Sequence, residues 1–437
     1  DFLLLFIAVT AWAYGCGLLI AKWEGEARAK TTMVIGIIGC LIVLGIFKYL
    51  NFFMDSFAAL IGTTPENLGY HWQLILPIGV SFYVFHAIGY IVDVFRKDTP
   101  ATRSFVDFAA FMALFPHMIA GPVLRFRDLT DQFIKREHSL PIFTSGLYIF
   151  TIGLSKKVLI ADTVAPIADQ TFAMANPTMV ESWLGAIAYM LQLYFDFSGY
   201  SDMAIGLALM MGFRFKQNFN TPYLSLSITE FWQRWHISLS TWLRDYLYIP
   251  LGGNRKGSAR TYVNLFLVML LGGLWHGAAW TYVLWGAWHG AWLACERYTG
   301  WARNVPSRAI ALPVTLVLVL IGWVMFRAAN VGDAFTVYGG MIGLNGITPS
   351  IEFLANVTRE NLLFLVLAIF AVFAEPYFKK LTDAENGIEA HGFSVSPNGT
   401  AVAIPSLAYP IAMSLLLVVT VARLSEQSVS PFLYFQF

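Results

Sequence analysis

Long apolar runs dominate this chain and restrict what it can fold into. A helix that crosses a bilayer needs about 20 mainly apolar residues. The stretches that meet this requirement cover residues 2–20, 31–50, 74–95, 181–212, 261–280, 281–296, 309–327, 361–378 and 403–422. Two interrupted stretches, 104–121 and 142–165, are weaker candidates. Because lipid does not tolerate open sheet edges, we predict an all-α polytopic membrane protein with about 10–12 membrane helices plus re-entrant or interfacial helices.

The composition supports the same class. Hydrophobic residues make up 57% of the 437 and charged residues 13%, whereas a soluble domain carries about 25% charged residues. The formal net charge of +1 gives no reason to expect a nucleic acid as a partner. We predict one integral membrane domain over residues 1–437. The chain begins inside an apolar run without a Met, so we expect an N-terminal segment to be missing from this numbering.

The distribution of lysine and arginine along the chain predicts which helix ends lie on the same side of the membrane. Nearly all of these basic residues lie in segments 22–30, 96–103, 125–136, 214–216, 234–260, 297–308 and 379–380. Segments 51–72, 158–213, 328–358 and 424–437 have none. The positive-inside rule places the basic set in the cytoplasm and the bare set outside. Both ends of 104–121 are basic, so this segment is expected to enter the membrane and return.

A predicted helical hairpin at residues 261–296 places a histidine deep in the membrane. Both ends of the hairpin, at Arg260 and Arg297, belong to the basic set, so the chain is expected to enter the membrane from the cytoplasm and return to the same side. At 1.5 Å per residue His276 lies about 24 Å from the inner face. This depth falls within an apolar core about 30 Å thick. A titratable side chain there is a functional candidate.

Three histidines occur in aromatic motifs, with His236 in Arg-Trp-His, His276 in Leu-Trp-His-Gly and His289 in Trp-His-Gly. Histidine is the usual proton acceptor near neutral pH. Attack of a sugar hydroxyl on an acyl thioester needs one such base and no metal. The alternative for His276 is a structural bond to a neighbouring carbonyl, and we rank His236 and His289 below it.

Two acidic residues, Asp196 and Asp202, lie in an otherwise apolar segment. They could serve in acid–base chemistry or bind a cation. We favour a structural role, in which they bond helix ends or pair with Arg234, Arg244 or another buried base, since buried charges are normally paired.

Basic residues suggest where an anionic ligand would bind. The turn-rich stretch 245–254, followed by Arg255 and Lys256, could receive the phosphates of a cytoplasmic carrier. An ordinary positive-inside loop is the alternative. Lys156 and Lys157 interrupt a predicted helix and are expected to extend to the inner interface.

Several motifs resemble the membrane-bound O-acyltransferase superfamily, and most closely its bacterial alginate O-acetyltransferase branch, whose relatives include the D-alanyl transferase of teichoic acids and peptidoglycan O-acetyltransferases. The matching stretches are residues 76–83 with 91–93, 115–122, 153–158, 194–203, 218–223, 231–240, 245–253 and 273–277. They define a core from about residue 45 to 330, and helices 361–422 follow it. The ending 430–437 also looks like this branch.

This resemblance implies a ring of tilted helices around a central tunnel. It implies that His276 is the catalytic residue and His236 the second functional position. The residues that we assign to donor binding are Trp275, Arg234, Asp245, Arg255 and Lys256. The residues that we assign to the tunnel or to structural roles are Asp196, Asp202, Asn218 and Trp232. No metal and no permanently bound cofactor are expected.

The resemblance also implies a reaction and its partners. Acetyl-CoA is the expected acetyl donor. Periplasmic SGNH esterase-like proteins are the expected partners that pass acetyl to an exported polysaccharide. The expected location is the bacterial inner membrane. The sequence does not identify the polysaccharide.

Two rival functions belong to other classes. A proton-coupled transporter or polysaccharide exporter would use Asp196, Asp202 and the histidines as a proton path, but no inverted repeat with matched broken helices is visible. Proton-coupled uptake without thioester consumption would favour it. A non-catalytic anchor for periplasmic enzymes would recruit partners without transferring any acetyl group.

Overall fold

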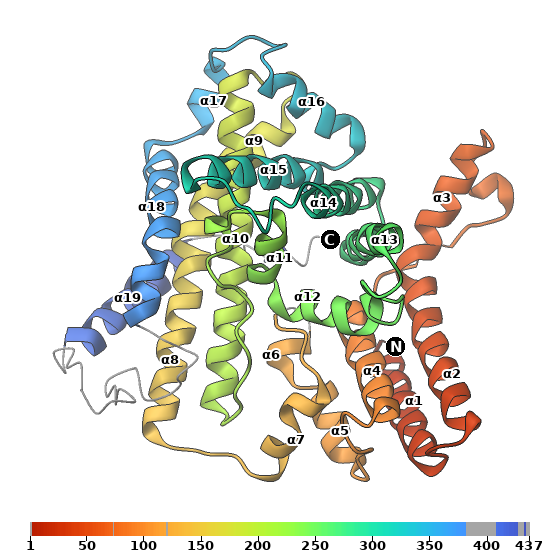
Figure 1. Cartoon of the computed structure of the whole chain (residues 1–437). Coiled ribbons are helices and arrows are strands. Elements are labelled where there is room, and N and C mark those ends of the chain that lie inside the picture. The colour runs from red at the N-terminus through yellow and green to blue at the C-terminus, as the bar shows by residue number, and fades with distance from the viewer. Residues whose placement is uncertain (1, 73, 119–120, 382–407, 427–431, 434–437) are drawn as a thin grey trace.

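The chain folds as an assembly of helices (Figure 1). The computed structural model describes all residues except 1, 73, 119–120, 382–407, 427–431 and 434–437. Within the described part no residue forms a strand, which confirms the all-α prediction.

The first half of the chain runs from α1 to α9. Its helices are α1 (Phe2–Lys22), α2 (Ala27–Leu44), α3 (Leu50–Leu60), α4 (Val80–Arg96), α5 (Phe105–Met112), α6 (Phe115–Met118), α7 (Phe126–Ile134), α8 (Leu140–Ser155) and α9 (Asp162–Ala173). A π-helical turn, Gly45–Tyr49, joins α2 to α3, and another, Lys156–Ala161, joins α8 to α9.

The second half begins with the longest helix. Its helices are α10 (Met179–Met210), α11 (Ile228–Arg234), α12 (Ile237–Leu243), α13 (Ser258–His276), α14 (Trp280–Thr299), α15 (Arg308–Arg327), α16 (Val331–Met341), α17 (Ile351–Asn356), α18 (Arg359–Leu381) and α19 (Ala408–Glu426). A third π-helical turn, Arg244–Tyr248, follows α12.

Several helices are long and apolar enough to cross a membrane. Judged by length and composition alone, the described residues contain five, at Phe2–Lys22, Ala27–Leu60, Arg308–Arg327, Arg359–Tyr377 and Ala408–Glu426. Helix α10 is also long, but it contains Glu181, Asp196 and Asp202 and buries most of its residues. A helix that is enclosed by other helices does not need a uniformly apolar surface.

The two weaker candidate segments behave differently from each other. Segment 104–121 does not form one helix, since α5 ends at Met112 and the short α6 follows. This break agrees with a segment that does not cross. Segment 142–165 instead belongs to a helical run that continues to Ala173. Residues 403–407 of the last predicted span lie outside the described residues, and so does most of the ending 430–437.

The buried apolar side chains form two clusters that meet at the α13–α14 hairpin. The first cluster is built mainly from α1, α2, α4, α5 and α7 and includes Trp275 of α13. The second is built around α9, α10 and α15 and includes Trp285 of α14. The hairpin therefore joins the two halves of the protein, and His276 lies where they meet.

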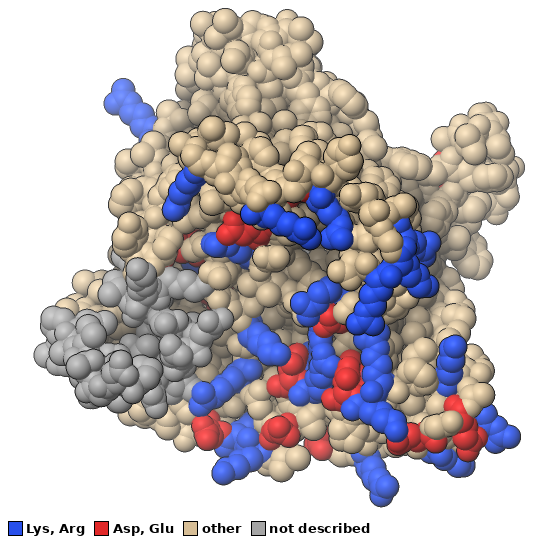
Figure 2. All heavy atoms as spheres, in the orientation of Figure 1, with Lys and Arg blue, Asp and Glu red and all other residues tan. Residues whose placement is uncertain are grey.

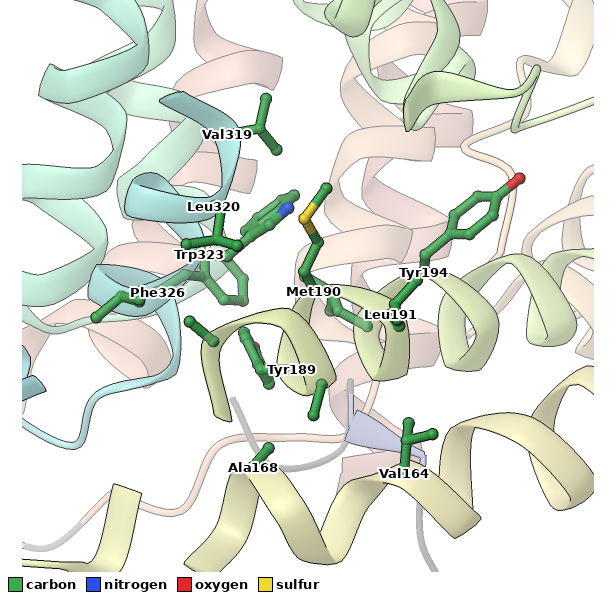
Figure 3. Close-up of a cluster of buried hydrophobic side chains, with 14 of the residues drawn as sticks. Val164, Ala168, Tyr189, Met190, Leu191, Tyr194, Val319, Leu320, Trp323 and Phe326 are labelled. Carbon is green, nitrogen blue, oxygen red and sulfur yellow. The ribbon is translucent and has the colours of Figure 1, made fainter. Parts of the chain in front are cut away.

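Helix α10 lies at the centre of the second cluster. Figure 3 shows Met190 pointing toward Leu320 and Trp323 of α15, while Val164 and Ala168 of α9 lie on the other side of α10. Burial of such side chains from water is worth about 1.5–3 kcal/mol for each large one. In a bilayer, close packing between helices supplies the stabilisation instead.

Charged side chains gather toward one end of the molecule. Figure 2 shows most Lys, Arg, Asp and Glu side chains on the lower half of the visible face. In Figure 1 helices α5 and α7 lie at this end, whereas α3, α16 and α17, from the segments without basic residues, lie at the other. The basic segments that contain α5 and α7 and the segments without basic residues that contain α3, α16 and α17 thus lie at opposite ends, in agreement with the predicted sidedness.

Helices α8 and α10 cross at a contact that only glycine permits. A Cβ atom added to Gly153 would lie 2.5 Å from the carbonyl oxygen of Gly199, and one added to Gly199 would lie 2.7 Å from the oxygen of Gly153. Both obstacles are backbone atoms, so no side chain can move aside. Small residues are the usual solution for close helix crossings in membranes.

We therefore expect Gly153→Ala to lower the free energy of unfolding by about 1–3 kcal/mol, the typical cost of overpacking. Gly15→Ala is a matched control, because Gly15 is also helical and has open space around it. Thermal unfolding of the two purified variants in detergent checks this. Equal melting temperatures for both would contradict the prediction.

Candidate active site

His276 is the last residue of α13, at the tip of the α13–α14 hairpin. The helix ends there because the backbone of Gly277 is extended, with φ −157°. The two helices approach closely, since a Cβ atom on Gly286 would lie 2.4 Å from the carbonyl oxygen of Met269. The predicted helical hairpin and the position of His276 near its apex are confirmed.

The His276 side chain is 8% exposed and lines a small cavity. The cavity has a volume of about 20 Å³, which is room for about one water molecule. Its walls come from α10, α13, α15, the segment between α11 and α12, and the end of the chain. The lining residues are Leu193, Asp196, Phe197, Trp235, His276, Trp323, Phe326 and Leu433.

Aromatic rings hold the His276 imidazole in place. Its centroid lies 5.2 Å from that of Trp285, 5.4 Å from Phe326 and 5.1 Å from Trp275, each in an edge-on arrangement. Within the described part of the chain, no side chain or backbone group forms a hydrogen bond with the ring nitrogens. The imidazole is therefore fixed by packing, and in its neutral form the unprotonated ring nitrogen is available to accept a proton.

His236 is held by a polar network in a strained backbone conformation. Its φ of +44° is in the left-handed region, which is unusual for a residue other than glycine. The Nδ1 atom lies 3.2 Å from Oδ1 of Asn218 and 3.4 Å from Oγ of Ser238. Asn218 also donates to Oγ of Ser201, at 3.1 Å. The buried Nε2 atom has no hydrogen-bond partner among the described residues.

The two histidines lie near each other around shared aromatic neighbours. The ring of Trp275 is 6.4 Å from that of His236 and 5.1 Å from that of His276. Phe197 lines the cavity and packs edge-on against His236 at 4.8 Å. Asn218 is the residue that orients His236, so its predicted structural role agrees with this geometry.

The two predicted acids are paired with lysines rather than with arginines. Asp196 lies 2.8 Å from Nζ of Lys157, and Asp202 lies 2.7 Å from Nζ of Lys156. The predicted pairing with a buried base is confirmed, but Arg234 and Arg244 are not the partners. Asp196 also lines the cavity beside His276.

The expectation that the two lysines extend to the interface is wrong for Lys157. Only 6% of its side chain is exposed, and it also pairs with Asp162 at 2.6 Å. The side chain of Lys156 is 22% exposed and turns toward Asp202. A buried ammonium group needs carboxylate partners. Helix α10 provides Asp196 for Lys157 and Asp202 for Lys156, on the face that packs against the π-helical turn Lys156–Ala161.

The residues that we assigned to donor binding do not line the cavity. Trp275 is buried and donates from Nε1 to the carbonyl of Ser81 at 3.4 Å. Arg234 pairs with Glu230 at 2.6 Å. Arg255 and Lys256 are exposed in the turn that precedes α13.

Asp245 forms ion pairs with Arg244 and with Arg125, each at 2.7 Å. Partial burial opposes ionisation of this carboxyl, but the hydrogen bonds from Arg244 and Arg125 outweigh it and hold the pKa of Asp245 below its ordinary value. Its negative charge is therefore satisfied by arginines, and we assign it a structural role in this loop.

His289 and Trp232 form a separate contact. Nε1 of Trp232 donates to Nδ1 of His289 at 3.3 Å, and His289 is fully buried. This structural partner agrees with the lower rank that we gave to His289.

Lys48 is a site residue that the motif analysis missed. It lies in the apolar segment 31–50, yet its ammonium group reaches the carbonyl of His276, 3.2 Å away. A lone lysine inside a predicted membrane helix was the available signal.

Comparison with known proteins identifies the family. The family model described as "MBOAT, membrane-bound O-acyltransferase family" matches residues 70–332, which include the hairpin, His236, His276 and the α10 acids. The chain belongs to the membrane-bound O-acyltransferase (MBOAT) family. It is therefore a multi-pass membrane enzyme that transfers acyl groups, as the sequence motifs predicted.

Several curated relatives share nearly the whole length of this MBOAT protein. Proteins named probable alginate O-acetylase AlgI are 52% identical in Azotobacter vinelandii and 51% identical in Pseudomonas putida, each covering 100% of this chain and 91% of the relative. The peptidoglycan O-acetyltransferase of Helicobacter pylori is 36% identical over 87% of this chain and 77% of its own length.

Proposed function

We propose that this protein O-acetylates an exported polysaccharide of the alginate type, with acetyl-CoA as donor and His276 as general base. The observation that carries the proposal is the imidazole of His276, which lines a small cavity and forms no hydrogen bond with the described residues. The identity of about half to probable alginate O-acetylases, over the full length of the chain, supports the choice of substrate.

The reaction needs one base and a water-poor site. The acceptor hydroxyl attacks the carbonyl carbon of the acetyl thioester while His276 accepts the hydroxyl proton. The C–S bond then breaks, and the leaving thiolate takes that proton back from the imidazolium. The products are the acetyl ester and free CoA thiol, and His276 returns to its neutral form.

The walls of the cavity suit this chemistry. Apart from Asp196 and His276 the lining side chains are apolar or aromatic, so they exclude water that would otherwise hydrolyse the thioester. The unpartnered Nε2 of His236 is the candidate to orient the donor or to stabilise developing charge. An acetyl group needs more room than about 20 Å³, so we expect the aromatic walls to move when the donor binds.

The charge distribution supports the direction of transfer. The basic end of the molecule (Figure 2) faces the cytoplasm of a bacterial inner membrane in this proposal. Acetyl-CoA approaches from that side, where the exposed Arg255 and Lys256 can contact its phosphates. Periplasmic SGNH esterase-like proteins complete the transfer to the polymer on the other side.

The test is a purified assay. The protein in liposomes, with acetyl-CoA and alginate or a candidate partner, is expected to release free CoA thiol and to form an alkali-labile acetyl ester. Acetyl-CoA without an acceptor gives the background rate. Proton-coupled uptake of a solute, without consumption of the thioester and without ester formation, would contradict the proposal and favour a transporter. Partner recruitment without any ester would favour an anchor.

A further inference from the structure

The end of helix α13 has carbonyl groups that its own backbone cannot satisfy. The last four carbonyls of a helix have no partner within it, and here they belong to Gly273, Leu274, Trp275 and His276. The Gly273 carbonyl accepts from the backbone N–H of Gly277, at 3.4 Å. The other three lie inside the protein, so their partners must come from another element.

Two consecutive residues of a distant helix supply these partners. The hydroxyl of Tyr49 donates to the carbonyl of Leu274 at 3.0 Å. The ammonium group of Lys48 donates to the carbonyl of Trp275 and, at 3.2 Å, to that of His276. Three successive carbonyls at the end of α13 are thus capped by residues more than 220 positions earlier in the chain.

Each N–H donor of the Lys48 ammonium group has a hydrogen-bond acceptor. The group carries three N–H donors, and its acceptors are the two α13 carbonyls and Oγ of Ser81, at 3.1 Å. Lys48 is 9% exposed. A buried charge of this kind is costly unless it is bonded, and its positive charge also matches the negative end of the α13 dipole.

A local change of helix type places Lys48 and Tyr49 toward the end of α13. Lys48 and Tyr49 lie in the π-helical turn Gly45–Tyr49, inside the otherwise α-helical run from Ala27 to Leu60. A π-helical turn rotates the following residues relative to a regular helix and is frequent at functional sites.

We propose that Lys48 is a positioning residue for His276. It holds the carbonyl of the same residue whose imidazole is the proposed base, and so it fixes the helix end from which the ring enters the cavity. The inference rests on the proposed function of His276. A displacement of about 1 Å in a reacting group can cost about 100-fold in rate, which is why a cap on this residue matters for catalysis.

The test compares variants in the acetyl-transfer assay. Lys48→Met keeps the length of the side chain and removes its donors, and we expect kcat to fall about 10- to 100-fold while KM for acetyl-CoA stays within about twofold. Lys48→Arg keeps donors and charge and should recover at least part of kcat. Asn51→Leu is the control, because Asn51 lies one turn further along the same helix and bonds Leu74 and Tyr70 instead of α13.

The outcomes separate this inference from the proposed function. Activity in His276→Ala would remove the proposed function itself. An inactive His276→Ala together with an unchanged kcat in Lys48→Met would overturn only the role of Lys48. An equal loss of kcat in Asn51→Leu would also overturn it, because general loosening of the helix would then suffice. If Lys48→Met is not recovered as folded protein, Lys48→Leu, which also lacks donors, decides, and a normal kcat in that variant counts against the inference.

Discussion

His276→Ala is expected to lower acetyl transfer about 10²- to 10⁴-fold, the range that a general base contributes. The ring nitrogens form no hydrogen bond with the described residues, so their loss leaves no polar group unsatisfied. We therefore expect the variant to fold and to keep its affinity for the donor. The measurement is CoA thiol release and acetyl ester formation by equal amounts of folded wild type and variant.

Two further substitutions sharpen this result. His276→Gln fills the cavity better than alanine but has no basic nitrogen, so it should be as inactive as His276→Ala. His71→Ala changes a histidine in an exposed loop and should keep full activity. Wild-type rates in either His276 variant would show that the proton acceptor is another group.

Lys157→Met is expected to lower the free energy of unfolding by about 3–5 kcal/mol, the typical cost of breaking a buried ion pair by removing one partner. Lys157 lies 2.6 Å from Asp162 and 2.8 Å from Asp196, and all three side chains are less than 10% exposed. Removing the ammonium group leaves two carboxylates close together without their cation. Thermal or denaturant unfolding of the purified protein measures the loss.

The neighbouring lysine provides the control for this substitution. Lys156 forms an ion pair of similar length with Asp202, but both side chains are more than 20% exposed, so Lys156→Met should cost less. Adding Asp162→Asn and Asp196→Asn to Lys157→Met should restore part of the stability, because neutral amides then replace the two carboxylates that have lost the Lys157 ammonium group. Equal destabilisation by Lys156→Met and Lys157→Met would show that burial of the triad is not the cause.

Local sequence patterns were sufficient for the helices and for the main candidate residue. The apolar runs predicted most of the long helices within a few residues, because the need for about 20 apolar residues acts on each segment separately. The α13–α14 hairpin followed from basic residues at both of its ends. His276 was identifiable because a titratable side chain deep in an apolar hairpin is costly and therefore rarely accidental.

Pairings between distant segments were not predictable in the same way. Asp196 and Asp202 required a buried base, but Lys156, Lys157, Arg234 and Arg244 were all chemically suitable, and only the crossing of α8 and α10 selects the lysines. Lys157 was expected to extend to the interface because a lysine that interrupts an apolar helix usually places its ammonium group in water, whereas Asp162 and the more distant Asp196 pair with it inside the protein. Asp196, its partner, lies 39 positions further along the chain.

The amino-acid sequence by itself determined the class of protein, the helical hairpin and the candidate base, since each depends on the polarity of one continuous stretch. Only the tertiary structure decided which side chains surround that base. The cavity combines α10, α13, α15 and Leu433, and the cap on His276 comes from Lys48. These contacts depend on how helices pack at close range, and hydrophobic patterning along one helix does not specify its neighbour.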